Sequence, residues 1–406
     1  MQHSRWLAFV VFLAGTLLAG PLAFAEPQLE IQSGDRVLFV GNTLIERAQR
    51  YDYLELAITT RFPDVTYRNL GWSGDTVYGE ARAYFGSPAD GFNHLKEHVH
   101  ALEPTVLLVA YGLNESAQGE AGLEAFTEGL NRLLAMLSET GARIVLLSPL
   151  PHEQATSPVP DVSPANADIK LYSQRIAAVA EAGGHAYVDL YTLMDELQVA
   201  PPMPLTGNGI HLTELGYYHL AGALEAGLGW PRRQWHVHVD ASEIEQARGT
   251  QVQNIREDGA SILFDVTDDY LPLDLPGGVE ATRSEHLPPR VLQLSEIEDG
   301  TYQLLIDGNV IAEAEADAWA EGVEIHAGPS FQQAAALRKQ ILLKNKLFFH
   351  QFRPQNETYI RGFRKHEQGR HAADLPRFDP LIEEREVKIN RLRRPVTHTY
   401  EIKPVN

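Results

Sequence analysis

The chain has 406 residues, 44% of them hydrophobic, which is enough for two domains or for one large domain with appendages. Its 34 Lys and Arg residues face 54 Asp and Glu residues, and the net charge of -20 argues against nucleic acid or anionic lipid as a partner. The absence of cysteine excludes disulfides, zinc–thiolate and iron–sulfur sites, and thiol nucleophiles.

The first 25 residues have the pattern of a secretory signal peptide. His3 and Arg5 precede an apolar run over residues 6–18, and residues 23–25, Ala-Phe-Ala, form a small-x-small cleavage site. The alternative is a transmembrane anchor, but the apolar run is short for a span of about 20 residues. We therefore expect cleavage after Ala25, a secreted or periplasmic mature chain, and no integral membrane segment in that mature chain.

Residues 26–230 are predicted to form an α/β domain, because short apolar runs alternate there with longer amphipathic stretches. The expected strands are residues 37–40, 65–70, 105–110, 143–148 and 186–190. The expected helices include residues 44–61, 123–140 and 168–182. The predicted fold class is a doubly wound, mostly parallel five-stranded sheet with helices on both faces.

The pattern changes after Trp230. Expected strands over residues 235–239, 261–266, 290–294, 302–306 and 310–312 predict a small β-rich module at 231–329. Helices from Ser330 and over 380–392 predict a helical tail at 330–406. Residues 331–406 hold 16 basic and 8 acidic residues, so we favour a tail docked on an acidic body over a free anion-binding surface.

Three polar groups follow the expected strands. Thr43, in Gly-Asn-Thr-Leu after the first strand, lies at the carboxyl edge of the sheet near a helix N-terminus, where a developing oxyanion is favoured. The alternative is an ordinary helix cap by Asn42 or Thr43. After the second strand Gly74 can offer a bare N–H, and after the third Asn114 can donate its amide to an oxyanion.

A histidine completes this set of polar groups. His211 precedes a helix expected to open at Thr213, and it can act as a general base or be a structural histidine satisfied in a turn. The other histidines show no paired metal-binding spacing, and His236 and His238 are two residues apart, as on one face of a strand. No metal site is predicted.

The four blocks Gly41–Leu44, Ser73–Thr76, Gly112–Glu115 and Asn208–His211 resemble the blocks of the GDSL-type, or SGNH, hydrolase superfamily, in the family's order over about residues 35–228. In that family a serine attacks acyl esters, a glycine N–H and an asparagine complete the oxyanion hole, and an Asp-x-x-His block supplies the base. The resemblance implies an esterase that needs no cofactor.

Carried over residue by residue, the resemblance makes Thr43 the nucleophile, Gly74 and Asn114 the oxyanion hole, and His211 the base with Asn208 beside it. The remaining block residues expected to contact substrate are Asn42, Asp75 and Glu115. Ser73 is a rival nucleophile that ranks below Thr43, because Thr43 occupies the first strand-to-helix turn.

Two residues depart from the family pattern. Thr43 stands in place of the serine, and its extra methyl restricts χ1 and crowds attack. Asn208 stands in place of the aspartate and cannot offset the charge of an imidazolium. Replacement orienting groups are Asp75, Glu115 and Asp189, which the sequence alone cannot place.

The leading functional hypothesis is a secreted SGNH-type esterase acting on acyl, preferably acetyl, esters of carbohydrates. The alternative is a catalytically silent SGNH fold that binds glycan or a protein partner, against which the retained His211 and Asn114 argue. A polar run over residues 353–369 is typical either of a surface for sugar hydroxyls or carboxylates, or of a solvated loop whose arginines pair with acidic groups. The sequence does not indicate an oligomeric state.

Overall fold

The computed structural model describes residues 29–405, except for 155–159, 198, 200–202, 241–242, 278–282, 361 and 368–370. The predicted signal peptide, residues 1–25, lies outside the described residues. Within the described ranges, no helix is long and apolar enough to cross a membrane.

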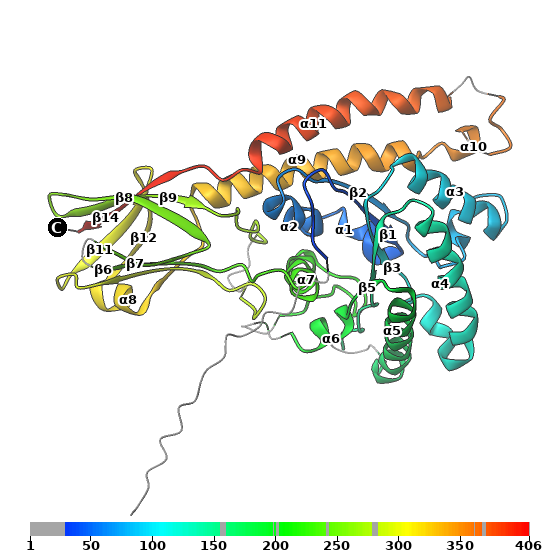
Figure 1. The fold of residues 1–406 in the computed structure, drawn as a ribbon, viewed down its shortest axis with the longest axis horizontal. Helices are drawn as coiled ribbons and strands as arrows, with labels where there is room; N and C mark the ends of the chain where they lie inside the picture. The colour runs from blue at the N-terminus through cyan, green and yellow to red at the C-terminus, as the bar shows by residue number, and fades with distance from the viewer. Residues whose placement is uncertain are drawn as a thin grey trace, which may run out of the picture.

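A five-stranded parallel sheet forms the centre of the α/β domain, as predicted (Figure 1). Its strands are β1 (Arg36–Gly41), β2 (Thr66–Gly71), β3 (Val106–Ala110), β4 (Arg143–Leu147) and β5 (Ala186–Val188), in the order β2-β1-β3-β4-β5. Both faces are buried: Val37 and Phe39 of β1 enter one hydrophobic core, while Leu38 and Val40 enter the other. This is why the strands are continuous apolar runs.

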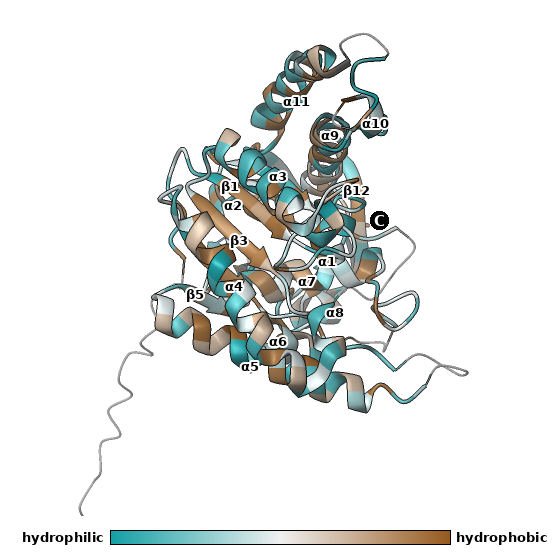
Figure 2. Cartoon of the chain, turned by 90° about the vertical axis from the view of Figure 1, so that its right-hand side faces the viewer, coloured by the Kyte–Doolittle hydropathy of each residue, from teal (hydrophilic) through white to brown (hydrophobic). Residues whose placement is uncertain are grey.

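Helices cover both faces of the sheet, and Figure 2 shows the hydrophobic strands between them. One face carries α1 (Thr43–Ala48), α2 (Tyr53–Arg61), α6 (Leu190–Asp195) and α7 (Glu214–Gly227). The other carries α3 (Pro88–Ala101), α4 (Leu123–Ser138) and α5 (Ser163–Gly183), with the short 3₁₀ segments Glu80–Arg82 and Glu115–Gly122 nearby.

The helix predicted over residues 44–61 is two helices, because the chain turns at Asp52. Asp52 has a left-handed backbone conformation, with φ +52°, which aspartate tolerates better than most residues. Its carboxylate accepts a hydrogen bond from Asn345 Nδ2 at 2.9 Å, so a distant part of the chain stabilises the break.

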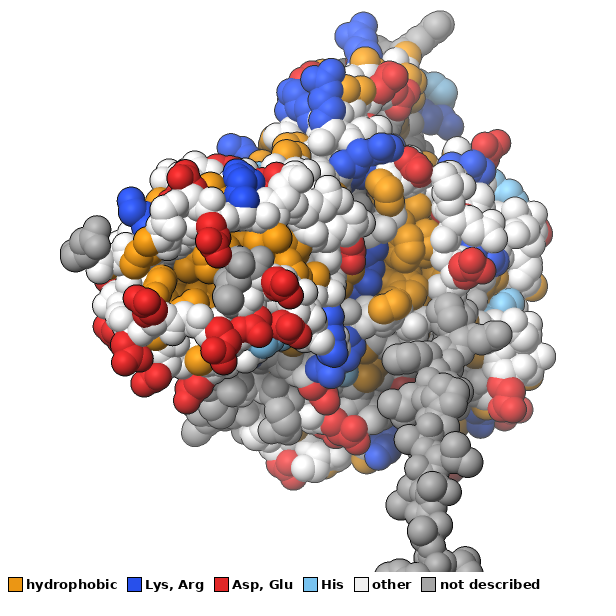
Figure 3. Space-filling model, turned by 60° about the vertical axis from the view of Figure 1, so that its left-hand side comes forward, with side chains coloured by type: hydrophobic (Ala, Val, Ile, Leu, Met, Phe, Trp, Pro, Cys, Tyr) orange, Lys and Arg blue, Asp and Glu red, His pale blue; other side chains and the backbone are white. Residues whose placement is uncertain are grey.

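The β module is a sandwich of two sheets, with strand orders β13-β10-β6-β7 and β12-β11-β14-β9-β8. Its elements are β6 (Trp235–Asp240), β7 (Glu243–Arg248), β8 (Thr250–Asp258), β9 (Ser261–Asp268), β10 (Arg290–Ser295), β11 (Thr301–Ile306), β12 (Asn309–Glu315), α8 (Ala316–Glu321) and β13 (Val323–Ile325). Residues 231–329 hold 20 acidic and 6 basic residues. On the face that Figure 3 shows, acidic side chains surround a hydrophobic patch on this module.

The C-terminal tail differs from the predicted helical segment in one respect. Helices α9 (Pro329–Phe352), α10 (Glu357–Ile360) and α11 (Asp379–Leu392) and the 3₁₀ segment His371–Phe378 are followed by a strand, β14 (His398–Pro404). This strand pairs with β9 and β11, and its Tyr400 and Ile402 are buried in the core of the β module. Residues 398–404 therefore complete the second sheet and do not belong to a separate tail.

Helices α9 and α11 lie side by side across the α/β domain (Figure 1). Leu337 and Ile341 of α9 enter one domain core, and Phe348 and Phe352 enter the other. Basic side chains of α9 meet acidic groups of the body: Arg338 pairs with Glu214 at 2.8 Å and Asp274 at 2.7 Å, and the buried Lys344 pairs with Glu55. Burial and charge thus both hold the tail on the domain.

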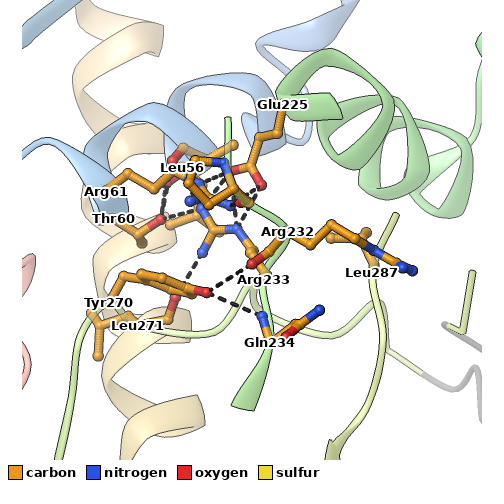
Figure 4. A network of polar contacts seen from close by, with 12 residues as sticks. Leu56, Thr60, Arg61, Glu225, Arg232, Arg233, Gln234, Tyr270, Leu271 and Leu287 are labelled. Carbon is orange, nitrogen blue, oxygen red and sulfur yellow. Dashed lines mark hydrogen bonds and ion pairs between the residues drawn. The ribbon is translucent and has the colours of Figure 1, made fainter. Parts of the chain in front are cut away.

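A polar network joins the β module to the α/β domain (Figure 4). Glu225 of α7 is bonded by Arg61 of α2 at 2.8 Å and by Arg233 of the linker at 2.6 Å. The guanidinium carbons of Arg61 and Arg233 lie 4.8 and 5.1 Å from the centre of the Tyr270 ring. Burial alone raises the pKa of Glu225, but Arg233 and Arg61 reverse this effect and lower it. The junction is therefore a buried ion cluster in which two guanidinium groups share one carboxylate.

Candidate active site

The candidate active site is a pocket at the carboxyl edge of the sheet, between the ends of β1 and β3. The sheet order reverses there, because β1 is followed by β2 on one side and β3 lies on the other, and α/β proteins commonly bind ligands at such a point. The residues that line the pocket are Asn42, Thr43, Leu44, Arg47, Ala110, Tyr111, Leu113, Asn114, Pro149, Leu150, His152, Ile210, His211, Leu212 and Tyr217. The structure thus brings Thr43, Asn114, His211 and Asn42 together.

Thr43 is the first residue of α1, and its hydroxyl is free of a capping role. Asn42 Oδ1 accepts from Leu44 N at 3.1 Å and caps the helix instead. Thr43 Oγ1 accepts a hydrogen bond of 3.0 Å from Gly74 N–H. The hydroxyl therefore faces an N–H donor placed for an oxyanion.

Gly74 lies in the loop after β2 with φ +76°, a conformation that favours glycine. The N–H of the preceding Ser73 is bonded to the carboxylate of Glu46, one turn along α1. Neither Ser73 nor Gly74 is among the pocket-lining residues, but Gly74 N–H is the group bonded to Thr43 Oγ1. The loop consequently directs Gly74 N–H, and not the Ser73 hydroxyl, at Thr43.

Asn114 faces the pocket from the end of β3. One N–H of its amide donates to Asp75 O at 2.8 Å, which ties the Asn114 turn to the Gly74 loop. A primary amide carries two N–H donors, so one remains for a ligand.

The expectation that Asp75 and Glu115 contact substrate is corrected by the structure, because neither lines the pocket and both are buried. Asp75 Oδ2 accepts from Arg82 Nε at 2.5 Å and from Tyr111 Oη at 2.9 Å. Glu115 accepts from the backbone N–H groups of Val77 at 2.9 Å and Gly112 at 3.0 Å. Burial raises the pKa of Glu115, although these backbone bonds lower it. Both carboxylates shape loops.

Asn208 orients His211. Asn208 Oδ1 accepts from the backbone N–H groups of His211 at 2.9 Å and Ile210 at 3.3 Å, which fixes which end of the amide is oxygen. Nδ2 therefore faces His211 Nδ1, at 3.1 Å. Because an amide NH₂ can only donate, Nδ1 must be the acceptor and the ring proton lies on Nε2.

His211 is neutral in this arrangement, because desolvation, followed by the charges of Arg47 and Arg50, lowers its pKa. A general base must instead present an unprotonated Nε2 to the nucleophile. Thr43 and His211 both lie in the described part of the chain, and no hydrogen bond joins their side chains there. Nor do Asp75, Glu115 or Asp189 take the place of the family's aspartate, since Asp189 caps α6 through Thr192 N at 3.1 Å.

Sequence reasoning missed Glu153, which holds the loop that carries His211. Its carboxylate accepts from the N–H groups of Leu205 at 3.0 Å and Thr206 at 2.8 Å, and its own N–H donates to Gly209 O at 2.8 Å. A sequence signal existed, because Glu153 follows β4 at the same sheet edge. His152, its neighbour, lines the pocket, and desolvation lowers its pKa.

In the part of the chain that the structure describes, no three His, Asp or Glu residues gather as they do around a metal ion. His238 Nε2 lies 2.9 Å from Ser295 Oγ, a contact on the surface of the β module.

The comparisons with known proteins agree with this geometry. Residues 40–218, which lie within the α/β domain, match the model of the GDSL-like Lipase/Acylhydrolase family. No curated protein matches the sequence.

Solved structures show the extent of the fold. The chain is similar to BT4096, described as a gut microbial diltiazem-metabolizing enzyme, with 18% identity and a TM-score of 0.70 over 93% of this chain and 99% of that chain. Axe2, an acetylxylan esterase from Geobacillus stearothermophilus, has 19% identity and a TM-score of 0.40 over 50% of this chain and 98% of that one. LAE5, an alpha/beta hydrolase from the metagenome of Lake Arreo, Spain, has 20% identity and a TM-score of 0.39 over 49% and 97%. The first similarity covers the β module and tail as well as the α/β domain.

Proposed function

We propose that the protein is an esterase that hydrolyses small acyl esters, with Thr43 as the nucleophile and His211 as the base. The observation that carries this proposal is the 3.0 Å contact between Thr43 Oγ1 and Gly74 N–H, in a pocket also lined by Asn114 and His211. The match of residues 40–218 to the GDSL-like Lipase/Acylhydrolase family supports the class of reaction.

In the proposed reaction Thr43 Oγ1 attacks the ester carbonyl carbon, and its proton passes to His211 Nε2. The carbonyl electrons move onto oxygen, where Gly74 N–H and the Asn114 amide stabilise the negative charge. The intermediate collapses, the alcohol leaves with the proton from His211, and an acyl-Thr43 ester remains. Water then repeats the sequence and releases the carboxylic acid.

The proton transfer first requires the side-chain amide of Asn208 to rotate by half a turn, so that its oxygen faces His211 Nδ1. The ring proton of His211 can then lie on Nδ1, which leaves Nε2 free to accept a proton. Turning the amide gives up the two backbone hydrogen bonds of Asn208 Oδ1. At about 0.5–1.5 kcal/mol for each bond, this costs about 1–3 kcal/mol and slows turnover about 5-fold to 160-fold. The proposed enzyme is therefore slow.

The substrate class follows from two properties. The side chains of Leu44, Leu113 and Leu150 give the pocket apolar walls suited to a small acyl group such as acetyl. The proposal that the alcohol is a carbohydrate rests on the predicted export of the chain. The polar run at 353–369 adds no support, because Arg353 pairs with Glu46 and Arg364 with Glu367.

Hydrolysis of p-nitrophenyl acetate by the mature chain tests the proposal. We expect Thr43→Ala and His211→Ala to abolish hydrolysis and Thr43→Ser to retain or raise it. Mass spectrometry should find the acyl group on Thr43 in rapidly quenched wild-type protein. Activity that survives Thr43→Ala contradicts the assignment of the nucleophile.

One observation favours a second function, a silent SGNH fold that binds an ester or glycan. The Asn208–His211 hydrogen bond keeps Nε2 protonated, so that His211 presents a donor to the pocket. Absence of activity in the wild type, together with activity in Thr43→Ser with Asn208→Asp, would establish this second function, because the oxyanion hole would be intact around a disabled nucleophile and base.

A further inference from the structure

Helix α9 ends beside the loop that carries Gly74. Figure 1 shows α9 running from the β module across the α/β domain to the neighbourhood of α3. Its last residue, Phe352, packs edge-on against Trp72, with ring centres 6.3 Å apart, and Arg353 follows directly. The C-terminal tail thus contacts the candidate oxyanion loop.

Arg353 makes two contacts there. Its Nη1 is 2.7 Å from Glu46 Oε2, and its guanidinium carbon lies 4.0 Å from the centre of the Trp72 ring. Both partners of the ion pair are mostly shielded, with side-chain exposures of 26% for Arg353 and 16% for Glu46. Shielding makes this pair stronger than an ordinary surface ion pair.

The same Glu46 oxygen that pairs with Arg353 accepts the N–H of Ser73. Ser73 directly precedes Gly74 in the chain. The hydrogen bond from Ser73 N–H to Glu46 therefore holds the backbone next to the Gly74 N–H, which points at Thr43 Oγ1. A side chain on Gly74 would meet nothing within 4 Å, so packing at that position cannot hold the loop. The orientation of the Gly74 loop therefore depends on hydrogen bonds made by its neighbours, such as that from Ser73 N–H to Glu46.

A second arginine holds the loop from inside the domain. Buried Arg82 donates to Asp75 and to Leu70 O at 2.7 Å, and its guanidinium carbon lies 5.2 Å from the centre of the Trp72 ring. Trp72 is therefore in contact with Arg82 from the domain and Arg353 from the tail.

We propose that Arg353 is a positioning residue, through which the C-terminal tail sets the direction of the Gly74 N–H by way of Glu46 and Trp72. This inference rests on the proposed function in one respect, the role of the Gly74 N–H as an oxyanion donor. It gives the tail a part in catalysis beyond its packing.

The test compares two variants of the full mature chain. Arg353→Met keeps an apolar stem on Trp72 and removes the ion pair. The matched control is Arg68→Met, because Arg68 also joins body and tail, through Glu386 at 2.6 Å, with similar exposures of 23% and 20%. The guanidinium carbon of Arg68 also lies 5.4 Å from the centre of an aromatic ring, that of Phe348. Among the described residues, no contact of the Arg68 side chain reaches the Gly74 loop.

Hydrogen exchange measured by mass spectrometry on a peptide covering residues 70–76 does not depend on activity. We expect exchange there to become about tenfold faster in Arg353→Met, the effect of losing one charge-assisted hydrogen bond, and to stay unchanged in Arg68→Met. Arg353→Lys, which keeps a cation for Glu46, should restore most of the protection. Unchanged exchange in Arg353→Met, or the same increase in both variants, overturns the proposal.

Kinetics supply the second readout. With p-nitrophenyl acetate we expect kcat to fall about tenfold in Arg353→Met with little change in KM, and both constants to be retained in Arg68→Met. A fall in kcat without faster exchange at 70–76 also overturns the proposal. A wild-type protein without activity refutes the proposed function instead, and the exchange result alone then decides whether Arg353 positions the loop.

Discussion

The two sides of the candidate pocket are built differently. On the oxyanion side, Gly74 and Asn114 match the family pattern, and contacts from Glu46, Arg82 and Asp75 hold their loops. On the base side, Asn208 replaces an aspartate, and its amide holds His211 with the ring proton on Nε2. In the proposed reaction the first side supplies the donors for a tetrahedral intermediate, while the second holds the proton on the nitrogen that would have to accept one.

This difference teaches that a site can keep its shape and still change its chemistry. Asn208 keeps the backbone hydrogen bonds that a carboxylate could also accept, so the loop around His211 is well ordered. What changes is the side-chain atom that faces His211 Nδ1. In asparagine it is Nδ2, a donor, whereas in aspartate it would be an oxygen, an acceptor. Proton transfer, and not the architecture of the pocket, is therefore the step that distinguishes the two sides.

The largest expected effect comes from Asn208→Asp. A carboxylate can accept from the backbone and from His211 Nδ1–H at once, which leaves Nε2 free without any rearrangement. We expect kcat for p-nitrophenyl acetate to rise by at least the cost of turning the amide, about 5-fold to 160-fold. The rise can reach about 10⁴-fold, the loss seen when a catalytic triad undergoes the reverse change, because the carboxylate also offsets the charge of the imidazolium. Nitrogen NMR of His211 should show the proton on Nε2 in the wild type and on Nδ1 in the variant.

Asn208→Ala is the control for this change, since it removes the amide without supplying an acceptor. It should not raise kcat. If the wild-type spectrum already shows the proton on Nδ1, the contrast between the two sides of the pocket is wrong.

Much of the fold is predictable because parallel strands are apolar on both faces and stand out as continuous runs. The edge strands β7 and β8 carry polar residues on both faces and give no such signal. β14 does alternate, with Tyr400 and Ile402 buried, but its place between β9 and β11 depends on a helical pair bringing it back. The break at Asp52 likewise depends on Asn345, which is 293 residues away.

The sequence predicts where the candidate site lies, but not the orientation of every side chain in it. Three strand ends and the loop before α7 place Thr43, Gly74, Asn114 and His211 at one sheet edge. The inward turn of Asp75 depends on Arg82 and Tyr111, which no sequence pattern links to it. The orientation of Asn208 had a signal, because asparagine commonly bonds the backbone two residues on, but only the structure shows which atom is left for His211.

On the oxyanion side, Asn114→Ala tests whether the matched residues act as the geometry indicates. Loss of one oxyanion donor should lower kcat about 10²-fold to 10³-fold with little change in KM. Ser116→Ala is the matched control, because it removes a 2.8 Å hydrogen bond to Leu113 O in the same turn without altering a pocket-lining side chain. Equal losses in the two variants would mean that the turn matters only structurally.

The smallest expected effect concerns the pH dependence of the base side. Catalysis needs neutral His211, so the rate should rise with pH and reach half its maximum below 6.5, since desolvation and the charges of Arg47 and Arg50 lower the pKa of His211 from that value. Arg47→Met removes the larger of the two charge effects and should move the midpoint upward, while Arg50→Met should move it less in the same direction. The measurement is kcat/KM for p-nitrophenyl acetate from pH 5 to 8 with Asn208 retained, because an aspartate at 208 would itself raise the pKa of His211. The chain with wild-type residues at 47 and 50 is the reference. A midpoint that falls on loss of either arginine would show that a group other than His211 governs the rate, because removing a positive charge can only make protonation of His211 easier.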